Sequence, residues 1–233
     1  MNNQNFIGQK AMEKSIEVLK ILLDTGIKPN QCQNERYLHH YFSKEMQNQK
    51  DLEIDFGNLQ NSKLHPEWPT YKKSTGISFS KYRKNGEKKY IVDTDDGSSG
   101  FIDFTIGDYS KPAFAIEFTS KYGFGREDLT YDFLKLLDAK NPFEYVVSFN
   151  LIFRENGLPK GGHEENIIKA LTEVLADIID KEKGRNLEIA ENRQYLFWII
   201  EIDNNGENRH WICEDVNSGF EKKEPNFSKY KKV

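Results

Sequence analysis

Two apolar segments joined by a short turn constrain the fold of this chain more than any other feature. Residues 101–106 read Phe-Ile-Asp-Phe-Thr-Ile, and residues 113–120 read Ala-Phe-Ala-Ile-Glu-Phe-Thr-Ser. Aromatic and β-branched runs of this kind are typical of strands, and a turn that begins at Gly107 predicts that the two strands are antiparallel neighbours. Each predicted strand carries a single carboxylate, Asp103 in the first and Glu117 in the second.

A carboxylate inside an apolar strand is costly unless it is paired, bound to a metal or on an open face. Side chains directly opposite each other in an antiparallel pair lie about 4.5–5.5 Å apart, so Asp103 and Glu117 would repel unless a cation bridged them. Oxygen ligands favour Mg²⁺ or Mn²⁺. The alternative for Asp103 is a solvated aspartate on the exposed face of a half-buried strand.

Glu35 is the third candidate. It lies near the start of a helix predicted for residues 34–48, three and seven residues before Leu38 and Phe42, and so on the apolar face of that helix. Alternatively, it only complements the positive end of the helix dipole. The neighbouring His39 and His40 cannot share one helix face, so we expect no zinc site there.

Periodicity along the rest of the chain predicts an α/β fold with a mixed sheet. Residues 51–75 are expected to be irregular, because Pro66 and Pro69 disfavour regular structure. Asn85-Gly86 is a strong signal for a hairpin turn. The predicted helices are 6–24, 34–48, 127–140 and 164–181; the predicted strands are a four-strand antiparallel meander (77–82, 88–92, 101–106 and 113–120), a buried strand 144–153 and a hairpin 194–202 and 209–214.

This order of elements, with Glu35 on a helix and then Asp103 and Glu117 on strands, resembles the PD-(D/E)XK nuclease superfamily, which includes restriction endonucleases. The resemblance covers residues 34–154. It implies a restriction-endonuclease-like core within a single domain spanning residues 1–233, in which residues 155–233 add a helix, a hairpin and a basic tail.

The resemblance also implies a site and an activity. Asp103 and Glu117 would hold Mg²⁺ or Mn²⁺ with the Phe118 backbone carbonyl, and Glu35 would hold a second metal or a metal-bound water. The implied reaction is hydrolysis of DNA phosphodiester bonds, in restriction or phage defence. It requires no organic cofactor, and a homodimer is expected where both strands are cut.

The sequence departs from the family motif at two positions. Ile102 replaces the proline, which is often absent in the superfamily. Thr119 stands where the motif has its catalytic lysine. Lys121 shares a strand face with Glu117, because side chains repeat every two residues, so we expect Lys121 to supply the cation. Lys135 lies off the apolar stripe of the next predicted helix and is the weaker candidate. If Lys121 only begins a loop, the fold is catalytically degenerate.

The composition and net charge leave open two functions other than that of an active nuclease. Charged residues of both signs make up 30% of the chain and its formal net charge is −4, which is typical of a charged globular surface. Nucleic-acid-binding proteins are usually basic, although a local basic surface suffices for phosphate contact. The net charge and Thr119 therefore leave open a degenerate nuclease fold that binds nucleic acid or protein, and also an acidic protein-interaction domain.

The location of the protein is suggested by what the sequence lacks. Its longest apolar run, residues 195–200, is far shorter than the roughly 20 residues of a membrane helix. The first residues lack the pattern of a signal peptide. Cys32 and Cys213 have neither metal-ligand spacing nor a disulfide framework. We therefore expect a cytoplasmic protein that does not bind membranes.

Overall fold

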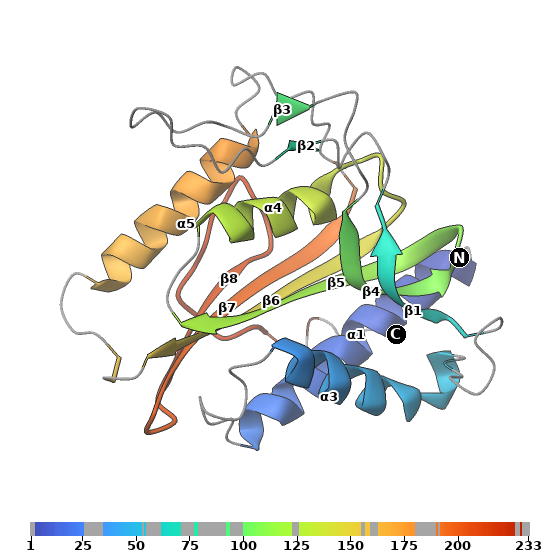
Figure 1. Ribbon diagram of the computed structural model, residues 1–233, viewed down its shortest axis with the longest axis horizontal. Coiled ribbons are helices and arrows are strands. Elements are labelled where there is room, and N and C mark those ends of the chain that lie inside the picture. Colours follow the sequence, from blue (N-terminus) through green and yellow to red (C-terminus); the bar gives the residue numbers. More distant parts are fainter. Residues whose placement is uncertain are drawn as a thin grey trace.

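The computed structural model of this chain describes residues 3–25, 35–52, 54, 62–70, 77–78, 92–93, 100–122, 126–154, 157–158, 163–179, 190, 192–226 and 229. A six-stranded mixed sheet has the order β1-β4-β5-β6-β7-β8 and is flanked by helices (Figure 1). The predicted class, α/β with a mixed sheet, is confirmed. The strands of this sheet are β1 (Leu64–Pro69), β4 (Phe101–Asp108), β5 (Lys111–Tyr122), β6 (Tyr145–Arg154), β7 (Gln194–Asp203) and β8 (Asn208–Cys213).

The direction of the strands divides the sheet into three parts. The central strands β5, β6 and β7 run parallel to one another. On one side β4 and then β1 are antiparallel to their neighbours, and on the other side β8 is antiparallel to β7. β6 has a strand on each side and is almost entirely buried, as its continuous apolar run predicts.

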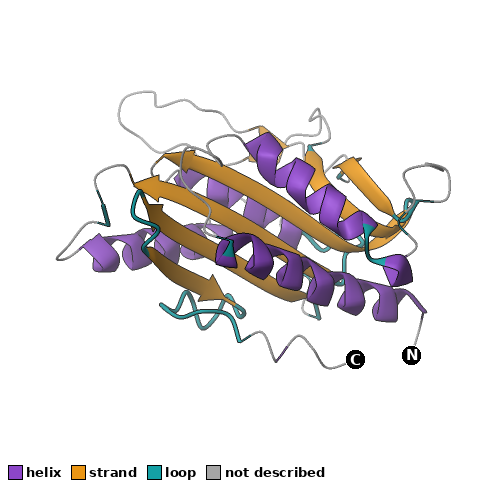
Figure 2. Cartoon of the chain, turned by 90° about the horizontal axis from the view of Figure 1, so that it is seen from below, coloured by secondary structure: helices purple, strands orange, loops and turns teal. Residues whose placement is uncertain are grey.

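Helices cover both faces of this sheet (Figures 1 and 2). α1 (Asn3–Asp24) and α3 (Glu35–Gln47) pack on one face, where Leu38, Phe42 and Met46 of α3 join a buried apolar cluster with residues of β4 and β5. α4 (Arg126–Leu137) and α5 (His163–Ile179) pack on the other face, over a second cluster. A short 3₁₀ helix, η1 (Lys50–Leu52), follows α3. The four predicted helices and the C-terminal hairpin are confirmed with small shifts of their ends.

The prediction that residues 51–75 are irregular is wrong for residues 64–69, which form the edge strand β1. Prolines are tolerated at a sheet edge, where one side of the strand needs no N–H donor. β1 pairs with β4 through Pro66↔Phe104 and Trp68↔Ile102. Between these pairs Glu67 has a φ of +51°, a left-handed conformation that is uncommon outside glycine.

The predicted four-strand meander is also wrong as a single sheet. β2 (Ile77–Ser78) and β3 (Val92–Asp93) pair with each other in a separate two-stranded sheet, whereas β4 and β5 belong to the large one. The predicted Asn85-Gly86 turn lies outside the described residues.

Candidate metal centre

A cluster of three potential metal ligands lies where α3 meets β4. One ligand atom each from Glu35, His39 and Asp103 lies within 4.8 Å of the other two. His39 Nε2 is 3.4 Å from Asp103 Oδ2. Two carboxylates and an imidazole are ligands for divalent metals, so this cluster can hold a metal ion.

Asp103 lies at the position in β4 where the two faces of the strand exchange sides. Ile102 packs in the core beneath α4, whereas Phe104 packs in the core beneath α3. Residues two apart on a regular strand share a face, so the strand must reverse its faces between them. The pairing of β4 with β5 extends to Phe104↔Ile116, and beyond that pair the Phe118 N–H donates to Asp103 Oδ2 at 2.7 Å.

His39 is held against this turn by aromatic contacts. Its ring centroid is 5.4 Å from that of Phe104 and 5.6 Å from that of Phe118. Its side chain keeps 22% of its surface exposed, and that of Asp103 keeps 15%. The imidazole is therefore fixed in position with its Nε2 buried toward Asp103, while other parts of the ring stay exposed.

The electrostatics of the cluster reflect its crowded negative charge. Burial raises the pKa of Glu35, and the Asp103 carboxylate raises it further. Burial alone would lower the pKa of His39, but contact with the Asp103 carboxylate and its negative charge outweigh that effect and raise it. Both shifts indicate a site that favours bound positive charge.

A second polar group lies beside the first, on the α4 side of the sheet. Lys135 of α4 places its ammonium 2.6 Å from Glu117 Oε1 and 3.2 Å from Asp132 Oδ1. The same ammonium donates to the backbone carbonyl of Phe101 at 3.0 Å. Asp132 Oδ2 accepts a hydrogen bond of 3.2 Å from the Thr119 hydroxyl. Side-chain exposures of 8% for Lys135 and 4% for Glu117 make this a buried ion pair.

Two carboxylates share one ammonium in this group. Burial raises the pKa of Glu117; Lys135 opposes that rise, while Asp132 and Asp103 add to it. Burial likewise raises the pKa of Asp132 against the effect of Lys135. The pKa of Lys135 is also raised, because Glu117 and Asp132 outweigh the cost of its burial. The influence of Asp103 on Glu117 places the two groups within electrostatic reach of each other.

The residues predicted from the sequence divide between the two groups. Glu35 and Asp103 belong to the three-ligand cluster, and Glu117 belongs to the ion pair with Lys135. The buried Phe118 links the two through its N–H bond to Asp103. Lys121 is half-buried near the end of β5. Their roles as metal ligands and catalytic groups stay predictions.

The sequence does not anticipate two residues of the site, His39 and Asp132, and it ranks Lys135 below Lys121. His39 and His40 cannot form a zinc site together, but the i, i+4 spacing from Glu35 places His39 on the same helix face as that carboxylate. The expectation that Lys135 lies off the buried face of its helix is wrong, because its relative exposure is 7%. Asp132, one helical turn before Lys135, gave no signal of its own in the sequence.

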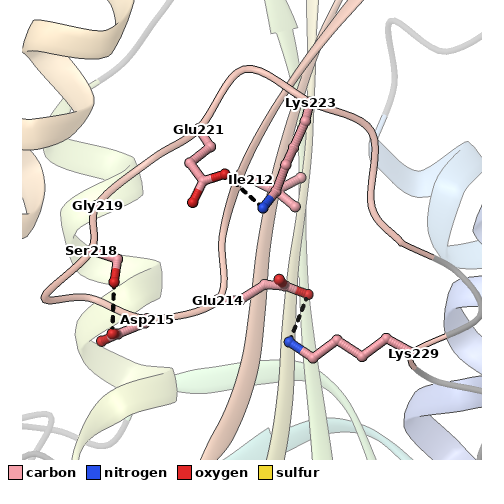
Figure 3. A pocket seen from close by; sticks show the side chains of 8 residues that line it. All are labelled: Ile212, Glu214, Asp215, Ser218, Gly219, Glu221, Lys223 and Lys229. Atoms are coloured by element: carbon pink, nitrogen blue, oxygen red, sulfur yellow. Dashed lines mark hydrogen bonds and ion pairs between the residues drawn. The ribbon is translucent and has the colours of Figure 1, made fainter.

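A polar pocket at the other edge of the sheet is separate from this site. It has a volume of about 240 Å³ and lies around the loop that follows β8 (Figure 3). Four of its charged side chains form ion pairs, Glu214 with Lys229 at 3.2 Å and Glu221 with Lys223 at 2.6 Å, and Asp215 accepts a hydrogen bond from the Ser218 hydroxyl at 2.8 Å. Three strands separate β8 from β4, so these two strands lie roughly 19 Å apart across the sheet at ~4.8 Å per strand.

Among the helices of the described residues, none combines the length and apolar character needed to cross a membrane. Comparisons with models of known protein families, with curated proteins and with solved structures found no significant match to this chain.

Proposed function

We propose that this protein is a metal-dependent nuclease that hydrolyses phosphodiester bonds of DNA. The observation that supports this most is the cluster of Glu35, His39 and Asp103 beside the buried Glu117–Lys135 pair. Metal ligands next to a fixed ammonium suit the transfer of a phosphoryl group, in which negative charge increases on the phosphate oxygens.

Glu35, His39 and Asp103 would hold the metal. A bound divalent ion supplies Lewis acidity and lowers the pKa of a bound water. Mg²⁺ prefers oxygen ligands, whereas imidazole is a ligand for transition metals, so His39 favours Mn²⁺ over Mg²⁺. Asp103 is oriented for this role because the Phe118 N–H fixes one of its oxygens.

Lys135, not Lys121, takes the role of the lysine in this proposal. Its ammonium contacts Glu117 directly, and Glu117 and Asp132 hold it in place. There it would stabilise negative charge on a phosphate bound at the adjacent metal. Glu117 would serve as the positioning residue for this ammonium.

Metal binding is tested by thermal unfolding with and without Mn²⁺ or Mg²⁺. We expect Mn²⁺ to raise the melting temperature of the wild type, by the equivalent of about 2.7 kcal/mol at one hundred times its dissociation constant. Asp103→Asn should be at least as stable as the wild type without metal, because it removes a charge that crowds Glu35, and should gain nothing from Mn²⁺. His39→Ala should lose more of the response to Mn²⁺ than of the response to Mg²⁺.

Catalysis is tested by a plasmid-nicking assay with Asp103→Ala as the blank. Lys135→Met should lower metal-dependent nicking by ~10²-fold or more, the range for a charge-stabilising group, and Lys121→Ala should lower it much less. Circular dichroism of each variant serves as the control for folding. If the wild type matches the blank on DNA and RNA, the nuclease proposal fails and a degenerate binding fold replaces it; if only Lys121→Ala is inactive, the assignment of Lys135 fails.

A further inference from the structure

The ammonium of Lys135 lies in an oxygen cage that resembles a site for a divalent cation. Its oxygens come from three elements: Glu117 Oε1 of β5, Asp132 Oδ1 of α4 and the Phe101 carbonyl of β4, at 2.6, 3.2 and 3.0 Å from Nζ. Carboxylate and backbone carbonyl oxygens are the ligands with which proteins hold Ca²⁺ and Mg²⁺. The ammonium donates to the Phe101 carbonyl and forms ion pairs with the two carboxylates.

Two of the three groups in the cage, Asp132 and the Phe101 carbonyl, are also held by contacts that do not involve Lys135. Thr119 donates to the second carboxylate oxygen of Asp132 at 3.2 Å. The backbone of Glu117 is fixed by the pairing of β5 with β6 through Glu117↔Ser148 and Thr119↔Asn150, whereas the contact shown for its Oε1 is the one with Lys135. The Phe101 carbonyl is fixed by β4, which pairs with β1 through Pro69↔Phe101. Asp132 and the Phe101 carbonyl would therefore keep their positions if the ammonium were removed, and Glu117 would keep its backbone position.

When both carboxylates are ionised, the charge of the cage also exceeds what one lysine supplies. Glu117 and Asp132 together carry two negative charges when ionised, and Lys135 offsets one of them. Buried charge without a partner is costly, so these oxygens would hold a doubly charged cation more strongly than a single ammonium. The oxygen distances of 2.6–3.2 Å are closer to those of Ca²⁺, about 2.3–2.6 Å, than to those of Mg²⁺, about 2.0–2.1 Å.

We propose that Lys135 occupies a latent divalent-cation site and acts there as the protein's own built-in cation. The chain then binds one divalent ion fewer than its oxygen ligands could hold. This deepens the proposed function, because it assigns the second positive charge of the phosphodiester site to a side chain. The cage itself does not depend on nuclease activity.

The test is the number of Ca²⁺ ions bound per chain, measured by isothermal titration calorimetry. Lys135→Ala should bind one more Ca²⁺ than the wild type, with a dissociation constant on the order of 10⁻⁴ M. Two matched variants should not gain this ion: Lys135→Met, whose stem still fills the cage, and Lys135→Ala/Asp132→Asn, which lacks one of its carboxylates.

The difference between variants separates this proposal from the proposed function. One ion in the wild type and two in Lys135→Ala support both. None in the wild type and one in Lys135→Ala supports the cage, and the Glu35–His39–Asp103 site is then decided separately by the effect of Mn²⁺ on the melting temperature of the wild type. Equal numbers in the two proteins overturn the cage. If Lys135→Ala is unfolded without metal, recovery of its circular dichroism in 10 mM Ca²⁺, an amount about one hundred times the expected dissociation constant, supports the cage, and failure to recover overturns it.

Discussion

Replacing Lys135 with methionine tests how much stability depends on the buried charges beneath α4. Methionine keeps nearly the same length and removes the ammonium, which leaves Glu117 and Asp132 without their cation. Exposures of 8% and 4% for the Lys135 and Glu117 side chains put this pair in the class of buried ion pairs. Removing one partner of such a pair costs about 3–5 kcal/mol.

Lys63→Met is the matched control. Lys63 lies 2.5 Å from Asp108, almost the same distance as in the buried pair, but the two side chains are 27% and 54% exposed. Exposed ion pairs contribute about 0–1 kcal/mol, because water solvates both partners after the change. The difference between the two variants therefore measures the effect of burial and not of distance.

The assay is urea unfolding in EDTA at pH 7.5 and pH 5.5. Burial raises the pKa of Glu117 and of Asp132, and removing Lys135 removes the main effect that opposes that rise, which leaves only the Thr119 hydroxyl to oppose it at Asp132. A carboxyl group whose pKa is higher in the folded state binds protons there first, so the folded state gains stability as the pH falls toward the ordinary value near 4.3. Lys135→Met should thus lose less stability at pH 5.5 than at pH 7.5. A loss below ~1 kcal/mol at both pH values, equal to that of Lys63→Met, would refute the reasoning.

Three further predictions concern other parts of the fold. Burial lowers the pKa of His210, whose Nδ1 accepts a hydrogen bond from Trp198 Nε1 at 3.1 Å. In urea unfolding the wild type should therefore lose stability relative to His210→Gln as the pH drops below about 6.5, and a constant difference between the two would contradict this. Arg193 is 7% exposed and donates to the carbonyls of four residues from the last turn of α4 to the start of β6. Arg193→Met should therefore lower the free energy of unfolding by about 3 kcal/mol or more, and a loss like that of a surface arginine would contradict this. Glu67→Gly should raise the melting temperature, since it relieves about 1 kcal/mol of strain at φ +51°; an unchanged or lower value would show that no strain is stored there.

The strand carboxylates could be found from the sequence because their surroundings are so apolar. Asp103 and Glu117 are the single charges of residues 101–106 and 113–118, and a buried charge requires a partner. The nature of that partner could not be predicted, because it comes from distant elements: His39 from α3 for Asp103 and Lys135 from α4 for Glu117. Single-sequence periodicity reports which face of an element is buried and carries no information about what covers it.

The position of Lys135 was missed because α4 is buried around most of its circumference. The stripe criterion assumes one apolar face toward the core and one polar face toward solvent. In α4, Thr130, Leu134 and Lys135 are buried along with the predicted stripe. The stripe criterion therefore predicts that a polar residue such as Lys135 is exposed, whereas its ammonium contacts Phe101 of β4 and Glu117 of β5.

The twist that creates the site involves two strands, and only one of them was predicted. β4 reverses its faces between Ile102 and Phe104, and β1 does the same between Leu64 and Trp68, with Glu67 in a left-handed conformation between them. Each reversal requires the other, because the two strands remain paired on both sides of it. Because the prolines of β1 argue against a strand there, the sequence does not predict the position at which β4 reverses its faces.

Thr119 then has a physical explanation that the family motif alone does not provide. Glu117 needs an ammonium at one position, and a lysine on β5 or a lysine on α4 can place it there. Lys135 arrives from the helix, and the short side chain of Thr119 leaves room for it while its hydroxyl orients Asp132, which holds the same ammonium. A lysine at position 119 would bring a second ammonium to these two carboxylates. The threonine and the helix lysine are therefore two halves of one arrangement, and the absence of the strand lysine does not argue against a working site.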